Sequence, residues 1–406
     1  MSVRKRRWLT SKGEPKEAWV VDYVDGQGER RLKTFQKKRD ADAFSATVTV
    51  EVRQGTHIAD SESVTAKEAA EIWYTAVKNG RDGRDPAEAS TLRQYRTHID
   101  LHIVPRIGKV KLSKLNARTV GSFRDELLQD LSRPMARKVL TSLKGIVGEA
   151  QSRDLVAVNA AASIKISMNS RHKEPVEMPT RAEISAVLAK LDELASQSVQ
   201  RNAKAWRRWR ALIATAIYTG CRASELRGLP WSSVDLDAGT LAIVQRADEK
   251  GVIGPVKSGA GYRTISMPAA LVTILRKWKL ECPGGALVFA NWQGNVENIS
   301  NIHKRCWQPL QHKAGLIKPV IDELGNVVRD GNGAAKCATK YPFHALRHFH
   351  ASMLINDGEA NPKEVQSEMG HSSIQITFDL YGHLFEDDHA VMRRRERAER
   401  LAAALV

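Results

Sequence analysis

The stretch MGHSSIQITFDLYGHL at residues 369–384 is the most informative part of this 406-residue chain, because it sets Tyr381 ten residues after His371. Three earlier stretches carry related polar groups: TGCRASELRGL at 219–229, GPVKSGAGYRTISMP at 254–268 and HALRHFHASMLINDG at 344–358. The side chains of interest in the four stretches are Arg222, Lys257, His344, Arg347, His371 and Tyr381. Guanidinium groups match the oxygens of a phosphate, and a phenol can attack phosphorus. These residues therefore predict phosphate chemistry.

The order and wording of the four stretches closely resemble the tyrosine recombinase family, specifically the integrases of phages and other mobile elements, over roughly residues 175–390. The resemblance implies an enzyme that recombines DNA at specific sites. Such an enzyme cuts and rejoins each strand through a 3′-phosphotyrosyl intermediate. It needs neither a metal ion nor another cofactor, because the covalent link stores the free energy of the broken bond.

The nucleophile and the phosphate-binding groups follow from this resemblance. Tyr381 would attack the scissile phosphate, and since the pKa of a free phenol is near 10, it would need a base or cationic neighbours. Arg222 and Arg347 would stabilise the extra negative charge of the transition state. Glu225, three residues after Arg222, is expected on the same helical face and could hold that arginine in place.

Lys257 and the histidines complete the predicted set. Lys257 resembles the β-hairpin lysine of the family and would protonate the leaving 5′-oxygen. His344 would accept or relay the tyrosyl proton, and His371 would donate a hydrogen bond to a phosphate oxygen. A competing interpretation is a metal site at His344 and His348, but the acidic residue of the HExxH pattern and a third ligand are missing. We therefore expect His348 to be a packing or supporting residue.

Composition narrows the class of partner. The chain has 63 basic and 46 acidic residues, for a net charge of +17, which favours a polyanionic partner such as nucleic acid. No apolar run reaches the roughly 18 residues that a membrane span needs, and the basic N-terminus leads into no signal-peptide core. The four cysteines are isolated, with no CxxC spacing. We expect a cytoplasmic protein that does not bind membranes.

The sequence predicts a mainly helical α+β protein with small sheets. Strand-like runs flank a turn at residues 25–28, and a helix with one apolar stripe follows them. Capping boxes begin helices at Thr65 and Thr180, a helix is expected to end before Pro105, and short strands are expected at 241–244 and 262–267. The expected parts are an arm-type DNA-binding module at 1–60, a helical core-binding (SAM-like) domain at 64–168, a catalytic domain at 175–390 and a C-terminal tail helix at 391–406.

Basic residues outside the catalytic part are candidate DNA contacts. Residues 3–39 hold 12 basic and 5 acidic residues, a local excess of 7, and resemble the arm-binding domain of integrases. Exposed basic residues are more often simply solvated, so the alternative is a solvated surface. The candidates are Arg30, Arg31, Lys33, Arg93, Arg96, Arg137 and Lys138. The segment 321–340 has glycine turns and no apolar periodicity, which predicts a surface loop or a small hairpin.

The resemblance implies double-stranded DNA carrying attachment sites as the substrate, and a tetramer of this chain on that DNA. A directionality factor and a host DNA-bending protein are further expected partners. Two alternative functions remain at this point. A type IB topoisomerase shares the arginine, lysine, histidine and tyrosine chemistry, and a DNA-binding regulator could keep the fold without catalysis.

Overall fold

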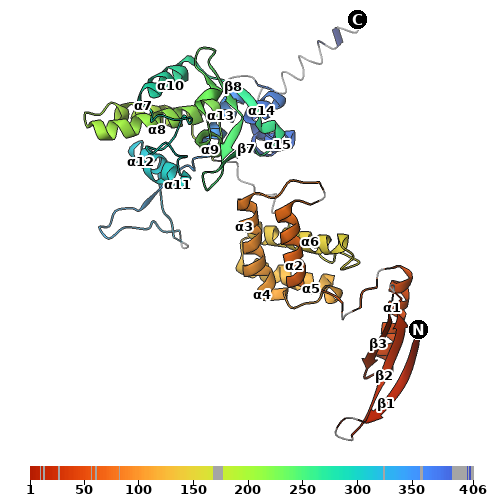
Figure 1. Ribbon diagram of the computed structural model, residues 1–406. Coiled ribbons are helices and arrows are strands. Elements are labelled where there is room, and N and C mark those ends of the chain that lie inside the picture. The colour runs from red at the N-terminus through yellow and green to blue at the C-terminus, as the bar shows by residue number, and fades with distance from the viewer. Residues whose placement is uncertain are drawn as a thin grey trace. The chain divides into compact units, whose positions relative to one another are not determined.

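The chain forms two compact units in the computed structural model, Met1–Lys173 and Glu174–Val406. Helices dominate and the strands form only small antiparallel sheets (Figure 1), which confirms the predicted fold class. The predicted domain boundaries are finer than this division and stay a prediction. The structure describes residues 1–9, 11, 14–25, 28–55, 57–59, 62–81, 83–167, 177–322, 325–356, 360–385, 400 and 402–403.

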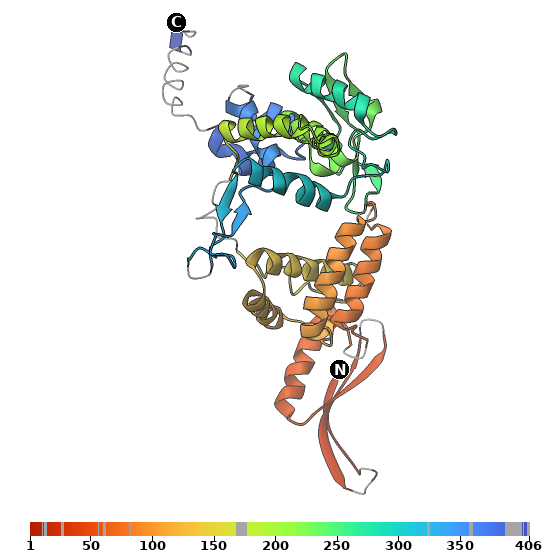
Figure 2. The ribbon, with the colours of Figure 1, turned by 90° about the vertical axis from the view of Figure 1, so that its left-hand side faces the viewer.

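The N-terminal unit begins with a three-stranded antiparallel sheet (Figure 2), in the order β1 (Ser2–Leu9), β2 (Pro15–Val24) and β3 (Arg30–Phe35). The β2–β3 hairpin was predicted, and helix α1 (Lys38–Arg53) covers Val21 and Tyr23 as the strand period requires. Strand β1 was not predicted. Its run of four basic residues has no apolar alternation, so only its pairing with β2 shows that it is a strand.

A helical bundle follows and has its own core, with Trp73, Phe123 and Leu143 almost fully buried. The predicted capping box at Thr65 is present. The helix expected to end before Pro105 instead continues through a π-helical turn into α4, because Pro105 sits in the first turn of α4, where no N–H donor is needed. The helices are α2 (Ala66–Asn79), α3 (Ala89–Thr97), α4 (Val104–Ile107), α5 (Ala117–Asp130) and α6 (Arg133–Ser152).

In its described part, the C-terminal unit is built around helices and three small sheets, in the orders β4-β5-β8, β6-β7 and β10-β9. The capping box at Thr180 and the two strands expected near 241–244 and 262–267 are confirmed. The helices are α7 (Arg181–Ala195), α8 (Gln200–Thr219), α9 (Ala223–Arg227), α10 (Ala269–Glu281), α11 (Ile299–Asn301), α12 (Gln308–Lys313), α13 (Ala345–Asn356), α14 (Pro362–Met369) and α15 (Ile374–Tyr381). The strands are β4 (Val234–Asp235), β5 (Thr240–Ile243), β6 (Gln245–Ala247), β7 (Ile253–Pro255) and β8 (Arg263–Ser266).

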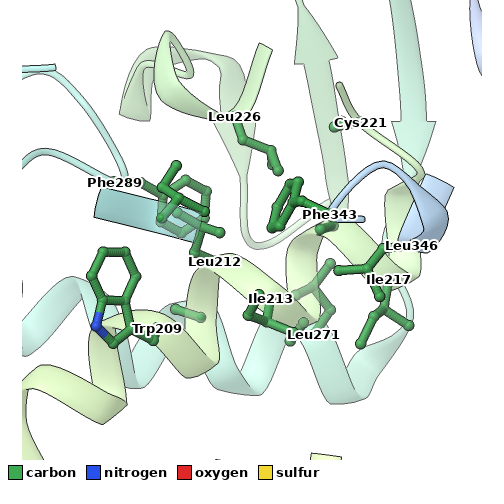
Figure 3. Close-up of a cluster of buried hydrophobic side chains, with 14 of the residues drawn as sticks. Trp209, Leu212, Ile213, Ile217, Cys221, Leu226, Leu271, Phe289, Phe343 and Leu346 are labelled. Atoms are coloured by element: carbon green, nitrogen blue, oxygen red, sulfur yellow. The ribbon is translucent and has the colours of Figure 1, made fainter. Parts of the chain in front are cut away.

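Helix α8 is the centre of the C-terminal core. Figure 3 shows Leu212 and Ile213 of this helix among side chains from α10 and from the start of α13, including Leu271 and Leu346. Full burial of one such side chain contributes roughly 1.5–3 kcal/mol to the free energy of unfolding. The core therefore fixes the C-terminal end of α8, and with it the chain that leads into Arg222.

The insertion at 321–340 is a hairpin, which is one of the two alternatives that the sequence predicts. Strands β9 (Ile317–Pro319) and β10 (Cys337–Thr339) pair antiparallel at its base. Most of the predicted tail helix at 391–406 lies outside the described residues. Within the described part of the chain, no helix is both long and apolar enough to cross a membrane.

Gly220 ends α8 in the left-handed region, with φ of 59°, and an added Cβ would come within 2.6 Å of the His350 ring. Gly220→Ala should therefore lower the free energy of unfolding by at least about 1 kcal/mol. Gly121, inside α5, has open space around its Cα, so Gly121→Ala should raise that free energy by about 0.5–1 kcal/mol. Urea unfolding of both variants against the unchanged protein checks the pair. A Gly220→Ala protein as stable as the parent would contradict the conformational argument.

Candidate active site

Arg222 and Glu225 are in contact, but not as two positions on one helical face. Arg222 is the N-cap of α9 and has an extended backbone, so it precedes the helix. Its backbone N–H donates to Glu225 Oε2 at 2.9 Å, and its Nη1 donates to Oε1 at 2.7 Å. Burial alone would raise the pKa of Glu225, but hydrogen bonds and charges from Arg263 and Arg222 lower it to about 2. The Glu225 carboxylate is therefore ionised, and it holds Arg222 in place at the start of α9.

Arg263 is a site residue that the sequence reasoning missed. It lies in β8, with a side chain only 5% exposed, and donates to Glu225 Oε2 at 2.8 Å. The signal that could have found it is the cation six residues after Lys257 in a predicted strand. Only the tertiary structure shows that this cation shares Glu225 with Arg222.

Two glycine carbonyls orient the two predicted phosphate-binding arginines. Arg222 Nη2 donates to the Gly370 carbonyl at 3.0 Å, and Arg347 Nη1 donates to the Gly220 carbonyl at 2.7 Å. Arg347 also donates to the Met369 carbonyl and is buried in α13. Both glycines have φ near +60°, which directs their carbonyls away from the helices that they end. Burial followed by the charge of Arg222 lowers the pKa of Arg347 to about 10, so it stays charged at pH 7.

Tyr381 is the last residue of α15 and is 1% exposed. Its hydroxyl lies 2.7 Å from Nδ1 of His348, and the two rings are 5.8 Å apart. Desolvation raises the pKa of Tyr381 to about 12, although the charges of Arg347 and Arg222 act in the opposite direction. The phenol is therefore protonated at neutral pH, and its nearest base is His348, the residue that we expected only to pack or support.

His344 lies just before α13 and makes no side-chain hydrogen bond to another described residue. Its ring is 4.9 Å from that of His348 in an edge-to-face arrangement. Desolvation by surrounding protein, then the charges of His348 and Arg347, lower the pKa of His344 to about 4, although part of its surface is open to solvent. His344 is thus neutral at pH 7, and among the described residues it is His348 that makes the hydrogen bond to the phenol.

His371 is buried beside the nucleophile candidate. Its Nδ1 lies 3.0 Å from the Thr377 hydroxyl, and its ring stacks on Tyr381 at 6.3 Å. Desolvation, followed by the charges of Arg347 and Arg222, lowers the pKa of His371 to about 4. With Nδ1 engaged, the other ring nitrogen of His371 is the one that can meet a phosphate.

Lys257 lies on the exposed turn between β7 and β8 and makes no ion pair within the described part of the chain. The structure thus brings Arg222, Arg347, His348, His371 and Tyr381 together and leaves the ammonium on a neighbouring turn. No group of three or more histidine, cysteine or acidic residues that could hold a metal occurs among the described residues.

The predicted DNA contacts fall into two groups. Arg30, Arg31 and Arg96 are held by carboxylates, Arg96 by both Glu71 and Asp100. The strand register places Arg30 on the opposite face of the sheet from Arg31, and contact of either residue with DNA stays a prediction.

The other candidates differ in what surrounds them. The ammonium of Lys33 lies 4.2 Å from the ring centre of Phe44. Arg93 is a residue of helix α3. Arg137 and Lys138, on α6, are exposed and have no ion-pair partner among the described residues. These two residues therefore present unneutralised charge to solvent.

Comparison with known proteins gives consistent results. The model of the phage integrase family matches residues 180–387. A tyrosine recombinase XerC-like protein of Caldanaerobacter subterraneus subsp. tengcongensis is 25% identical over 94% of this chain and 95% of its own length. The Tn1549 transposon integrase in complex with transposon right end DNA has a TM-score of 0.63, at 19% identity over 84% of this chain and 100% of that one. A lambda integrase tetramer bound to a Holliday junction has a TM-score of 0.51, at 16% identity over 90% and 95%.

The low pKa of His371 predicts how the free energy of unfolding depends on pH. An unfolded histidine has a pKa near 6.5, so between about pH 6.5 and 4 the unfolded chain binds a proton that the folded chain does not. The free energy of unfolding must therefore fall as the pH falls through this window. His371→Asn should remove about 2 kcal/mol of the loss between pH 7 and pH 5. Urea unfolding at both pH values measures this difference, and an equal loss in variant and parent would refute it.

Proposed function

The chain belongs to the phage integrase family and is a tyrosine-type site-specific DNA recombinase of a mobile element, and we propose that Tyr381 is its nucleophile. The observation that supports this proposal is the environment of the Tyr381 hydroxyl. Its hydroxyl lies 2.7 Å from the neutral imidazole of His348, within the field of Arg222 and Arg347. Tyrosines that only pack do not usually combine a base, two guanidiniums and burial.

In the proposed reaction the Tyr381 oxygen attacks the phosphorus of the scissile phosphodiester. Its proton passes to Nδ1 of His348, whose pKa is lowered by burial and by Arg347, so that the ring is neutral and can accept it. The bond from phosphorus to the 5′-oxygen breaks as the bond to Tyr381 forms. The products are a 3′-phosphotyrosyl link and a free 5′-hydroxyl.

Preorganised cations supply the main stabilisation of the transition state. Arg222 and Arg347 are each fixed by a glycine carbonyl, so little reorganisation is needed when a phosphate enters. The second nitrogen of His371 donates to a phosphate oxygen in this proposal. Lys257, which has no ion-pair partner in the part of the chain that the structure describes, gives its proton to the leaving 5′-oxygen.

DNA and further copies of this chain are the proposed partners. The lambda integrase tetramer bound to a Holliday junction supports a tetramer on attachment-site DNA. Arg137 and Lys138 would contact phosphates near the crossover site, and the N-terminal sheet would bind separate arm sites. A directionality factor, a host DNA-bending protein and a cytoplasmic location complete the proposal.

The alternative functions receive less support. A type IB topoisomerase would relax supercoiled DNA without joining two sites, whereas the relatives found are recombinases and integrases. A non-catalytic regulator would not need a nucleophile, a base and two oriented arginines in one place. Relaxation without recombination, with attachment sites supplied, would favour the topoisomerase.

Tyr381→Phe should abolish the covalent adduct with DNA while duplex binding persists, because only the attacking oxygen is removed. The measurement is covalent capture from a randomised duplex library, followed by sequencing of the trapped DNA, which also identifies a core-site duplex. Gel-shift affinity for that duplex is the control for folding. An adduct of normal yield in Tyr381→Phe would show that another residue is the nucleophile.

His348→Ala should slow adduct formation on the captured duplex by about 10²-fold or more, the usual contribution of a general base. His344→Ala should have a smaller effect, because among the described residues His348 is the histidine that makes a hydrogen bond to the phenol. Raising the pH should restore part of the rate in His348→Ala only, since hydroxide can then replace the missing base. If His344→Ala is the slower variant and shows this pH rescue, the base is His344 and our assignment is wrong.

A further inference from the structure

Arg263 joins α9, the end of α14 and the turn that carries Lys257. Through Nη2 and Nη1 it donates to both oxygens of Glu225, at 2.8 and 3.3 Å, and Glu225 in turn holds Arg222. Through Nε it donates to the carbonyl of Glu368 at 2.8 Å, near the end of α14. Through Nη1 it also donates to the carbonyl of Gly261 at 3.1 Å. A planar guanidinium can make all four contacts at once, which an ammonium cannot.

The contact with Gly261 concerns the turn that carries Lys257. This turn packs directly against the end of α14: an added Cβ on Gly370 would come within 2.9 Å of the Ala260 carbonyl and 3.0 Å of Arg263 Nη1. On the inner side of the turn, an added Cβ on Gly261 would come within 2.8 Å of Val256. The backbone of this turn is therefore tightly packed, and the Arg263 guanidinium is among its close neighbours.

The Lys257 side chain has no comparable restraint. It is exposed and makes no ion pair or hydrogen bond with a described residue, so its place is set by the backbone of its turn. The same side chain must reach one particular oxygen of the scissile phosphate, and misplacing a catalytic group by about 1 Å can cost about 10²-fold in rate. Whatever fixes the turn thus controls proton transfer.

We propose that Arg263 is a positioning residue for leaving-group protonation: by binding Glu225, Glu368 and Gly261 it holds the Lys257 turn against the end of α14. This inference rests on the proposed function, in which Lys257 is the general acid. It assigns to Arg263 an effect on one chemical step, in addition to any contribution to stability.

The test compares two substrates that differ in one atom. The captured core-site duplex is made with a 5′-oxygen or with a bridging 5′-sulfur at the cleaved phosphate, and the sulfur leaves as a thiolate without needing a proton. Lys257→Ala and Arg263→Lys should each form adduct at least about 10²-fold more slowly than the parent on the oxygen substrate. On the sulfur substrate both deficits should shrink by at least about tenfold. Tyr381→Phe should form no adduct with either.

Arg263→Lys keeps the positive charge beside Glu225 and loses the fork, which limits damage to the fold. Gly261→Ala perturbs the same turn while the Arg263 side chain itself is kept, and it should give the same selective rescue by sulfur. Arg276→Ala is the matched control, because Arg276 is an exposed arginine whose partners within the described ranges are Asp237 and the Leu236 carbonyl. It should cleave both substrates at the parent rate. Urea unfolding measures the stability of each variant.

The outcomes separate the two proposals. If Lys257→Ala is rescued by sulfur but Arg263→Lys and Gly261→Ala are equally slow on both substrates, Arg263 does not act through the turn and this inference is overturned. If Lys257→Ala is not rescued, Lys257 is not the general acid, and the inference falls together with that part of the proposed function. Rescue of all three variants supports both.

Discussion

The buried carboxylate of Glu225 is the interaction on which the active site depends. An ionised carboxylate with a side chain only 3% exposed would be strongly destabilising by itself. Arg222 and Arg263 offset that cost by occupying both of its oxygens, and the two pairs together leave a net positive charge. Removing one member of such a cluster typically costs about 3–5 kcal/mol, because the partner is left buried and unpaired. The phosphate-binding geometry is thus coupled to the stability of the fold.

The same surroundings affect the pKa of the Tyr381 phenol in two opposite directions. Burial keeps Tyr381 protonated, while the nearby guanidiniums favour its ionised form. In the proposed reaction a bound phosphate would neutralise part of the positive charge, and the neutral imidazole of His348 would take the proton during attack. The proposed mechanism therefore links proton removal to the arrival of the substrate. The guanidiniums are held in place by the hydrogen bonds that they donate to the carbonyls of Gly370 and Gly220.

Much of the fold was predictable because its signals are local. The capping boxes at Thr65 and Thr180 and the β2–β3 hairpin each depend on a few neighbouring residues, and all are present. For residues 321–340 the sequence left a loop or a hairpin open, and the structure shows the hairpin. Strand β1 and the helical path through Pro105 were not predicted, because pairing with a distant strand and a change of helix type leave no clear mark in a short window.

The sequence alone determined the family, the fold class and the chemical types at the site, since motif wording and residue chemistry are properties of the chain itself. Only the tertiary structure decided which groups are neighbours. It set His348 rather than His344 against Tyr381, and it brought Arg263 onto Glu225 from 38 residues away. The physical reason is that hydrogen bonds and desolvation depend on distances of a few ångströms, which packing of the whole domain sets and sequence spacing does not.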